Sequence, residues 1–275
     1  MMGMQGVPPK LDGLVAHMAA ASLGRLLADR GRLRIVTFHG VGRAVDDPFS
    51  LEPRKLNEFL RIVRDEGYLT LRACDLAGRP REKGQSCRAV VLTFDDGYAA
   101  HHDVVGEKLA HFGLVGTFFV ITSFLQERRS THHFNGRPQA FMSADDLRGL
   151  VSIGMDVGSH SHSHALMGAL SSARARQEAG LSKQLLEQCI ARSVSAFAYP
   201  YGRRNAYSRL TRTVLEECGY VTAFTQQGTP IGPLSDPLEL PRISIDATDT
   251  VRTFRRKLYG QYELMAKVKA HVRRD

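Results

Sequence analysis

The feature that most constrains the fold is a series of short apolar runs, rich in β-branched residues, that alternate with segments of helical periodicity. Runs such as 88–92, 117–122 and 194–199 have the length of buried strands, and the segments between them space apolar residues three and four apart. Parallel strands need a crossover, and a helix is the usual one. The alternation therefore predicts an α/β protein built from parallel βα units.

The chain is long enough for a single large domain. Its 275 residues are 43% hydrophobic, and α/β barrels of this length commonly form one domain, which we expect over residues 33–258. Residues 1–32 are predicted to hold a disordered start and an amphipathic helix over 11–29 that caps a barrel end or, as the alternative, lies on a membrane. Residues 259–275 are predicted to form a basic helical tail.

Charge and composition limit the partners and the compartment. The net charge of +9 is concentrated near the C-terminus, where a solvated helix or a weak contact with a membrane surface or an anionic glycan would explain it. No aromatic interleaving supports nucleic-acid binding. The start of the chain has no clean apolar core of a signal peptide, and no apolar run reaches membrane-spanning length, which favours a cytoplasmic protein. The four cysteines lack CxxC spacing and are expected to be free thiols.

Two adjacent carboxylates, Asp95 and Asp96, follow the strand predicted over 88–92. Neighbouring strand residues point to opposite sides, so the two cannot play the same role. Gly97 then allows a sharp turn. Carboxylates at the edge of a core need a cation or a shared proton, although a helix N-cap followed by a turn would be the simpler interpretation.

Three histidines follow a second short strand, in the order His160, His162 and His164. Neutral imidazole is a good ligand for divalent metals, and the serines between the histidines leave room for an ion. One Asp with two His would make a site of three ligands with open positions, which is typical of a hydrolytic centre. A solvated His/Ser loop is the alternative.

The ordered motifs Thr93-Phe94-Asp95-Asp96-Gly97, His160-Ser161-His162-Ser163-His164 and Pro200-Tyr201-Gly202 carry a family resemblance. Together they resemble those of polysaccharide deacetylases of the NodB-homology type, carbohydrate esterase family four. The resemblance implies a distorted (β/α) barrel of about seven parallel strands, with the site at their C-terminal ends. It also implies metal-dependent hydrolysis of N-acetyl groups from acetylated amino sugars in a polysaccharide, oligosaccharide or glycoconjugate.

The resemblance assigns a role to each matched residue. Asp95 would be the general base, and the backbone N–H of Tyr201, in the Pro200-Tyr201-Gly202 turn, would bind the oxyanion. One divalent ion, with zinc expected and nickel, cobalt, iron or manganese as alternatives, would be held by Asp96, His160 and His164. His162 would be dispensable for the metal.

The chain departs from the family pattern in three places. Ala198 stands where an arginine normally holds the base, and we expect Arg242 to replace it, with a surface arginine as the alternative. The chain has no tryptophan, so the family's late Asp-Trp motif is absent. The family's late strand, which ends in the histidine that acts as general acid, is also missing. His39 ends an early strand of the same pattern, and we expect it to be the general acid here. This resembles the circularly permuted exopolysaccharide deacetylases, in which the acid histidine comes first.

Two alternative functions stay open, and the residues around the site have expected positions. The same scaffold could cleave another C–N bond, in a formyl amine or a ureide ring, or could bind glycans without catalysis. His101 and His102 are expected at the surface at the start of a helix. Residues 126–142 are expected to form a long polar loop over the site.

Overall fold

A computed structural model describes residues 33–42, 47–77, 88–228, 231 and 235–261. The segment 1–32, including the helix expected over 11–29, and most of the basic tail predicted over 259–275 lie outside the described residues. Within the described part of the chain, every helix is too short or too polar to cross a membrane.

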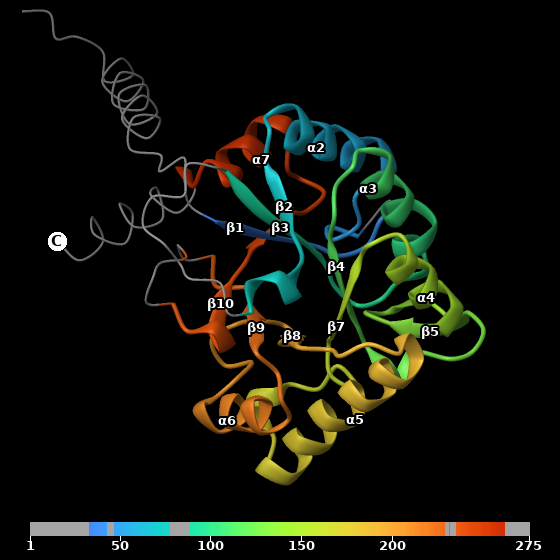
Figure 1. Ribbon diagram of the computed structural model, residues 1–275, viewed down its shortest axis with the longest axis vertical. Helices are drawn as coiled ribbons and strands as arrows, with labels where there is room; N and C mark the ends of the chain where they lie inside the picture. The colour runs from blue at the N-terminus through green and yellow to red at the C-terminus, as the bar shows by residue number, and fades with distance from the viewer. Residues whose placement is uncertain (1–32, 43–46, 78–87, 229–230, 232–234, 262–275) are drawn as a thin grey trace, which may run out of the picture.

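A mostly parallel sheet forms the centre of the molecule and curls into a nearly closed barrel (Figure 1). Its strands lie in the order β10-β9-β8-β7-β4-β3-β1-β11, and β2 branches off this order by pairing with the first half of β3. The strands are β1 (Arg34–Phe38), β2 (Leu69–Leu71), β3 (Ala89–Phe94), β4 (Thr117–Val120), β7 (Asp156–Ser159), β8 (Ala196–Ala198), β9 (Thr222–Thr225), β10 (Leu240–Pro241) and β11 (Ile243–Ser244).

The barrel closes through one short stretch of chain. β10 and β11 are separated only by Arg242, and β10 pairs with β9 while β11 pairs with β1, so both ends of the sheet belong to residues 240–244. This split stretch and the six strands β1, β3, β4, β7, β8 and β9 make the seven-stranded barrel that the resemblance implied. The prediction of a distorted (β/α) barrel is therefore confirmed.

Helices surround the strands, as Figure 1 shows. They are α2 (Pro53–Asp65), α3 (Glu107–His111), α4 (Ala144–Ser152), α5 (Ser172–Ile190), α6 (Arg209–Glu217) and α7 (Val251–Leu258). α2 shows why they form: Pro53 occupies its first turn, and Leu56, Phe59, Leu60 and Val63 are buried along one face.

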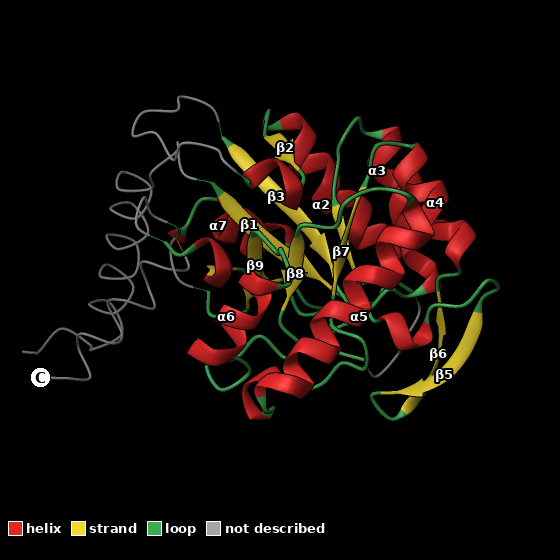
Figure 2. Ribbon diagram, turned by 60° about the horizontal axis from the view of Figure 1, so that its bottom comes forward, coloured by secondary structure: helices red, strands yellow, loops and turns green. Residues whose placement is uncertain are grey.

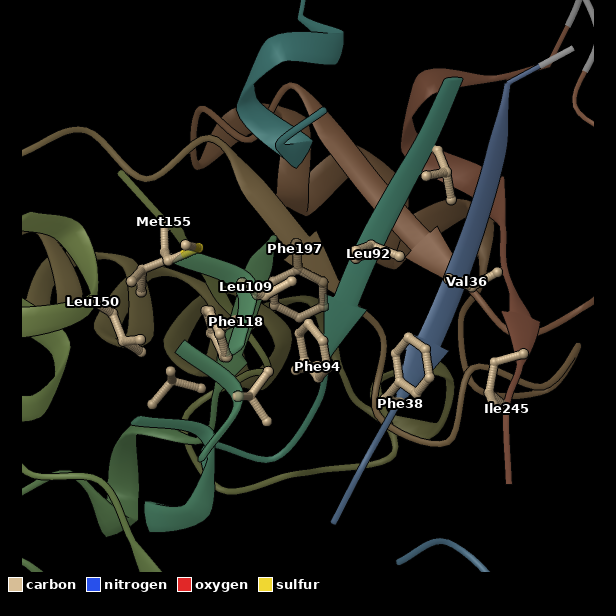
Figure 3. Close-up of a cluster of buried hydrophobic side chains, with 14 of the residues drawn as sticks. Val36, Phe38, Leu92, Phe94, Leu109, Phe118, Leu150, Met155, Phe197 and Ile245 are labelled. Atoms are coloured by element: carbon tan, nitrogen blue, oxygen red, sulfur yellow. The ribbon is translucent and has the colours of Figure 1, made fainter. Parts of the chain in front are cut away.

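Alternation along the strands divides the core in two. In β3, Leu92 and Phe94 face the surrounding helices and belong to the larger apolar cluster, part of which is drawn in Figure 3. Val91 belongs instead to a smaller cluster with residues of β1, β8 and β9. Asp95 follows Val91 by four positions, so the strand period directs it to the same side, the interior of the barrel. Both faces of β3 are buried, as expected for a parallel barrel strand.

The segment expected as a long polar loop over 126–142 contains regular structure. β5 (Ser130–Phe134) and β6 (Arg137–Phe141) form an antiparallel hairpin that stands apart from the barrel in Figure 2. Asn135 and Gly136 at its tip both have positive φ, of 51° and 77°, which is the two-residue turn that an Asn-Gly pair favours. The expectation of an irregular loop was therefore wrong.

Candidate active site

Polar side chains converge at the C-terminal ends of the barrel strands. His39 follows β1, Asp95 and Asp96 follow β3, His160 follows β7, and Tyr201 follows β8 after two residues. In parallel barrels this end carries the site, because the loops after the strands meet there. The motifs that are dispersed in the sequence thus come together in one place.

Asp96, His160 and His164 form a compact cluster of metal-ligating groups. One ligand atom from each lies within 4.8 Å of the others. Asp96 Oδ1 is 3.5 Å from His160 Nε2 and 3.7 Å from His164 Nε2. Among the described residues, these three are the only group of at least three His, Cys, Asp and Glu side chains with such spacing.

Both histidines present Nε2 to Asp96. His160 Nδ1 lies 2.8 Å from the carbonyl oxygen of Ala198, which can only accept, so Nδ1 donates and Nε2 faces the cluster. Burial lowers the pKa of His164 to about 3, and His160 adds to the effect. His164 is therefore neutral, which is the form that binds a metal.

The surroundings of the Asp96 carboxylate do not fully compensate its negative charge. Burial raises the pKa of Asp96, and the neighbouring Asp95 opposes its ionisation further, against the lowering influence of His39 and His160. Tyr98 donates a hydrogen bond to this carboxylate. A buried carboxylate beside two imidazoles that offer lone pairs fits a divalent cation, because the cation would replace the missing charge.

The backbone around the cluster is held in a sparsely populated conformation. Asp96, Ser161, His164 and Tyr201 have φ values of 79°, 62°, 59° and 64°. Only two other described residues apart from glycine have positive φ, so this left-handed conformation is concentrated at the site. It costs energy for residues with a Cβ, and such strain is typical of functional sites.

Arg242 and Asp95 form a bidentate ion pair inside the barrel. The two terminal nitrogens of Arg242 donate to the two carboxylate oxygens at 2.7 Å each, and Nη1 also donates to Thr93 Oγ1 at 3.1 Å. Both side chains of the ion pair are fully buried. This burial excludes the alternative of a surface arginine, and the contact puts Arg242 where it could orient Asp95.

The ion pair controls the charge of Asp95. Burial raises the pKa of Asp95, but Arg242, His160, a hydrogen bond from Arg242 and His39 together bring it well below its usual range. These influences favour the carboxylate form of Asp95. The bidentate contact also fixes its plane relative to the cluster.

His39 lies beside Asp95 and has several neighbours. Its Nε2 is 4.0 Å from Asp95 Oδ2 and 3.4 Å from the side-chain nitrogen of Gln226, which follows β9. Its carbonyl oxygen accepts from Nε2 of His101 at 2.8 Å. The ring of Phe49 packs on its imidazole at a centroid distance of 5.3 Å.

His101 contradicts the expectation of a surface position. It is fully buried, while His102 is about one-third exposed. His101 begins a π-helical turn over residues 101–106, and its ring packs edge-on against Phe94 and Tyr98. A π-helical turn spaces its side chains at a different angle from an α-helical one, which changes the side chain that faces inward.

The turn of the third motif lies against His164 and β9. Tyr201 is half exposed, and its ring centroid lies 4.7 Å from that of His164. Gln226 N–H donates to Gly202 O at 2.8 Å. Gly202 has a φ of 56°, and a Cβ there would come within 2.7 Å of Gln226 N, so only glycine allows this close approach.

Glu178 is a positioning residue that the sequence did not reveal. It lies on α5, is almost fully buried, and accepts from the N–H and the hydroxyl of Ser163 at 2.8 and 2.7 Å. Ser163 lies between the histidines of the cluster, so Glu178 ties this loop to a helix. His162 points elsewhere, with Nδ1 3.0 Å from Thr122 Oγ1. A glutamate at a regular helical position carries no sequence signal of this role.

The sequence matches the family model described as polysaccharide deacetylase over residues 82–223, more than half of the chain. The chain therefore belongs to the polysaccharide deacetylase family. It is 22% identical over 197 residues to the protein named "Putative polysaccharide deacetylase YxkH" of Bacillus subtilis (strain 168). That alignment covers 71% of this chain and 65% of the relative, so the chain spans slightly less than two thirds of the relative's length.

Solved structures share the fold. The Streptococcus pyogenes deacetylase PplD, solved in complex with acetate, superimposes with a TM-score of 0.71 and 21% identity, over 82% of this chain and 98% of that one. IcaB from Ammonifex degensii gives a TM-score of 0.67 and 21% identity, over 84% and 97% of the two chains. At these identities the likeness establishes the barrel, and the chemistry has to be argued from this chain's own residues.

Proposed function

We propose that the protein hydrolyses N-acetyl groups of acetylated amino sugars and releases acetate with the help of one divalent metal ion. The observation that carries this proposal is the pairing of two units at one end of the barrel. One is a buried carboxylate held by Arg242, and the other is the cluster of Asp96, His160 and His164. Membership of the polysaccharide deacetylase family and the acetate bound to the neighbour PplD support the same reaction.

Asp96, His160 and His164 would hold the ion. Two imidazoles and one carboxylate with open positions are typical of catalytic zinc, and we propose zinc as the metal. The bound ion would supply Lewis-acid activation of the amide carbonyl and of a water molecule. Burial of the cluster limits competition from bulk water for the same groups.

Asp95 would accept a proton from the attacking water. It lies 4.0 Å from His160 Nε2, so a water held at the cluster would be within its reach. The contact with Arg242 keeps Asp95 ionised, which is the form that accepts a proton, and fixes its orientation. The same contact weakens Asp95 as a base, so its effect depends on position more than on intrinsic basicity.

His39 would deliver a proton to the leaving amine, and the Tyr201 N–H would bind the oxyanion. His39 Nε2 and His160 Nε2 are each 4.0 Å from the same oxygen of Asp95, so the proposed acid and a proposed metal ligand both lie close to the base. The left-handed turn at Tyr201 sets the direction of its N–H, and preorganised donors of this kind stabilise developing negative charge.

Acetate release from N-acetylated amino sugars tests the proposal directly. Purified protein is stripped with a chelator, reloaded with zinc, and assayed on N-acetylglucosamine and its linear oligomers. We expect acetate release that disappears on stripping and returns on reloading. Release of formate from formylated amino sugars, with no acetate from any acetylated sugar, would replace deacetylation by cleavage of another C–N bond.

A further inference from the structure

The two aromatic side chains among the exposed large hydrophobic residues of the described chain both contact histidines of the site. Phe49 is 48% exposed and packs on His39, and Tyr201 is 51% exposed and packs on His164. The other members of this exposed set are aliphatic. Exposed aromatic rings in contact with the site residues offer an apolar surface on which a ligand can pack.

Phe49 is presented by a firmly held stretch, residues 47–51. Its N–H donates to Asp47 Oδ1 at 2.9 Å, and Pro48 O accepts from Ala247 N–H at 2.8 Å. The fully buried Leu51 donates its N–H to Gly40 O at 2.9 Å, next to His39. The ring is thus exposed without being loose, so binding to it would cost little conformational entropy.

The proposed reaction places the sugar on the same side as Phe49. The nitrogen that His39 protonates remains on the sugar when acetate leaves, so the sugar ring must approach His39. Phe49 covers one side of this imidazole and exposes about half of its own surface. Tyr201 packs against a different residue of the site, the metal-ligand candidate His164.

We propose that Phe49, which lies outside the three family motifs, and Tyr201 are stacking platforms for two different sugar rings of the glycan, so that oligomers bind more tightly than a single amino sugar. The apolar C–H face of a pyranose packs on an aromatic ring, while its hydroxyls remain in water. The proposal rests on the proposed function for its substrate class, but a binding measurement tests it separately.

The absence of tryptophan from the whole sequence provides a direct probe. Phe49→Trp, combined with Asp95→Asn to slow turnover, places one indole at the proposed platform. Linear oligomers of N-acetylglucosamine should change its fluorescence in a saturable way, at concentrations about tenfold lower than the monosaccharide requires. Leu69→Trp is the matched control, since Leu69 is 46% exposed and begins β2 beside the N-terminal end of β3, away from the site.

Kinetics distinguish stacking from mere support of His39. Phe49→Ala should lower kcat/KM about tenfold for oligomers, mostly through KM and more than for the monosaccharide, and Phe49→Tyr should restore most of it. An equal fall in kcat for every substrate, or an indole at position 49 that no sugar perturbs while acetate is released, would overturn the proposal. If no acetylated sugar is hydrolysed but the indole still reports oligomer binding, the proposed reaction fails and the platform stands.

Discussion

Replacing Arg242 by methionine would leave the carboxylate of Asp95 buried without its guanidinium. Both side chains are fully buried and joined by two hydrogen bonds of 2.7 Å. Removing one partner of such a pair typically costs about 3–5 kcal/mol of folding free energy. Arg255→Met is the matched control, because Arg255 pairs with Glu66 but is about half exposed, and such pairs contribute about 0–1 kcal/mol.

Urea unfolding of the four variants of a double-mutant cycle measures the pair itself. The cycle consists of wild type, Arg242→Met, Asp95→Asn and the double variant. Asparagine removes the charge, so the double variant should regain part of the stability that Arg242→Met loses.

Arg242→Lys should impair turnover without changing metal content, because an ammonium cannot reproduce the bidentate contact of a guanidinium with a carboxylate.

The pH dependence of the loss has a defined sign. Burial raises the pKa of Asp95, and Arg242 is the largest of the influences that together hold it well below its usual range. A depressed folded-state pKa stabilises the protein above the unfolded pKa, about 3.9 for Asp, and this stability disappears as the pH falls towards the folded pKa. In Arg242→Met burial prevails, so the pKa of Asp95 should rise and its acid-side loss of activity should move to higher pH.

The difference in stability between wild type and Arg242→Met should therefore be largest at neutral pH. It should shrink as the pH falls, first through the raised pKa of Asp95 in the variant and then through the unfolded value. The reasoning is refuted if Arg242→Met costs no more than Arg255→Met and leaves the rate and its pH profile unchanged.

Three further predictions concern the other site residues. His160→Ala and His164→Ala should each lower the content of divalent metal, measured by elemental analysis, while His162→Ala retains it; equal content in all three would reject the ligand assignment. Asp95→Asn should bind metal but lose about 10²–10⁴-fold in turnover, and near-normal turnover would remove it as the base. His39→Ala should lose most activity, most severely for substrates with poor leaving amines, and equal losses across leaving groups would argue against its role as the acid.

Strand ends were the part of the site that the sequence could predict. An apolar run fixes where a parallel strand lies, and the polar residues after it must then reach the C-terminal rim, which accounts for Asp95, Asp96 and His160. His39 and Arg242 were harder, because they lie far from Asp95 in sequence. Their proximity depends on barrel closure, which the pairing of β1 with β3 and β11 provides.

Features set by tertiary packing could not be predicted. His101 faces inward because a π-helical turn replaces an α-helical one, and no periodicity distinguishes the two over six residues. In the hairpin of β5 and β6, partly buried residues alternate with exposed ones. Because few of these residues are apolar, the segment resembles a polar loop in sequence. Phe49 is an ordinary residue in a short connection until the fold brings it onto His39.

The split strand at 240–244 explains how the chain can lack arginine at position 198. Ala198 belongs to the apolar cluster inside the barrel, and its carbonyl orients His160. The guanidinium of Arg242 lies 5.5 Å from the ring of Phe119, a member of that same cluster. An arginine on β8 and one at position 242 would therefore compete for the same closely packed interior beside Asp95. Arg242 lies between β10, which pairs with β9, and β11, which pairs with β1, and from this position its side chain enters the barrel and contacts the base. The small side chain of Ala198 thus leaves the space in the barrel interior that the side chain of Arg242 fills beside Asp95.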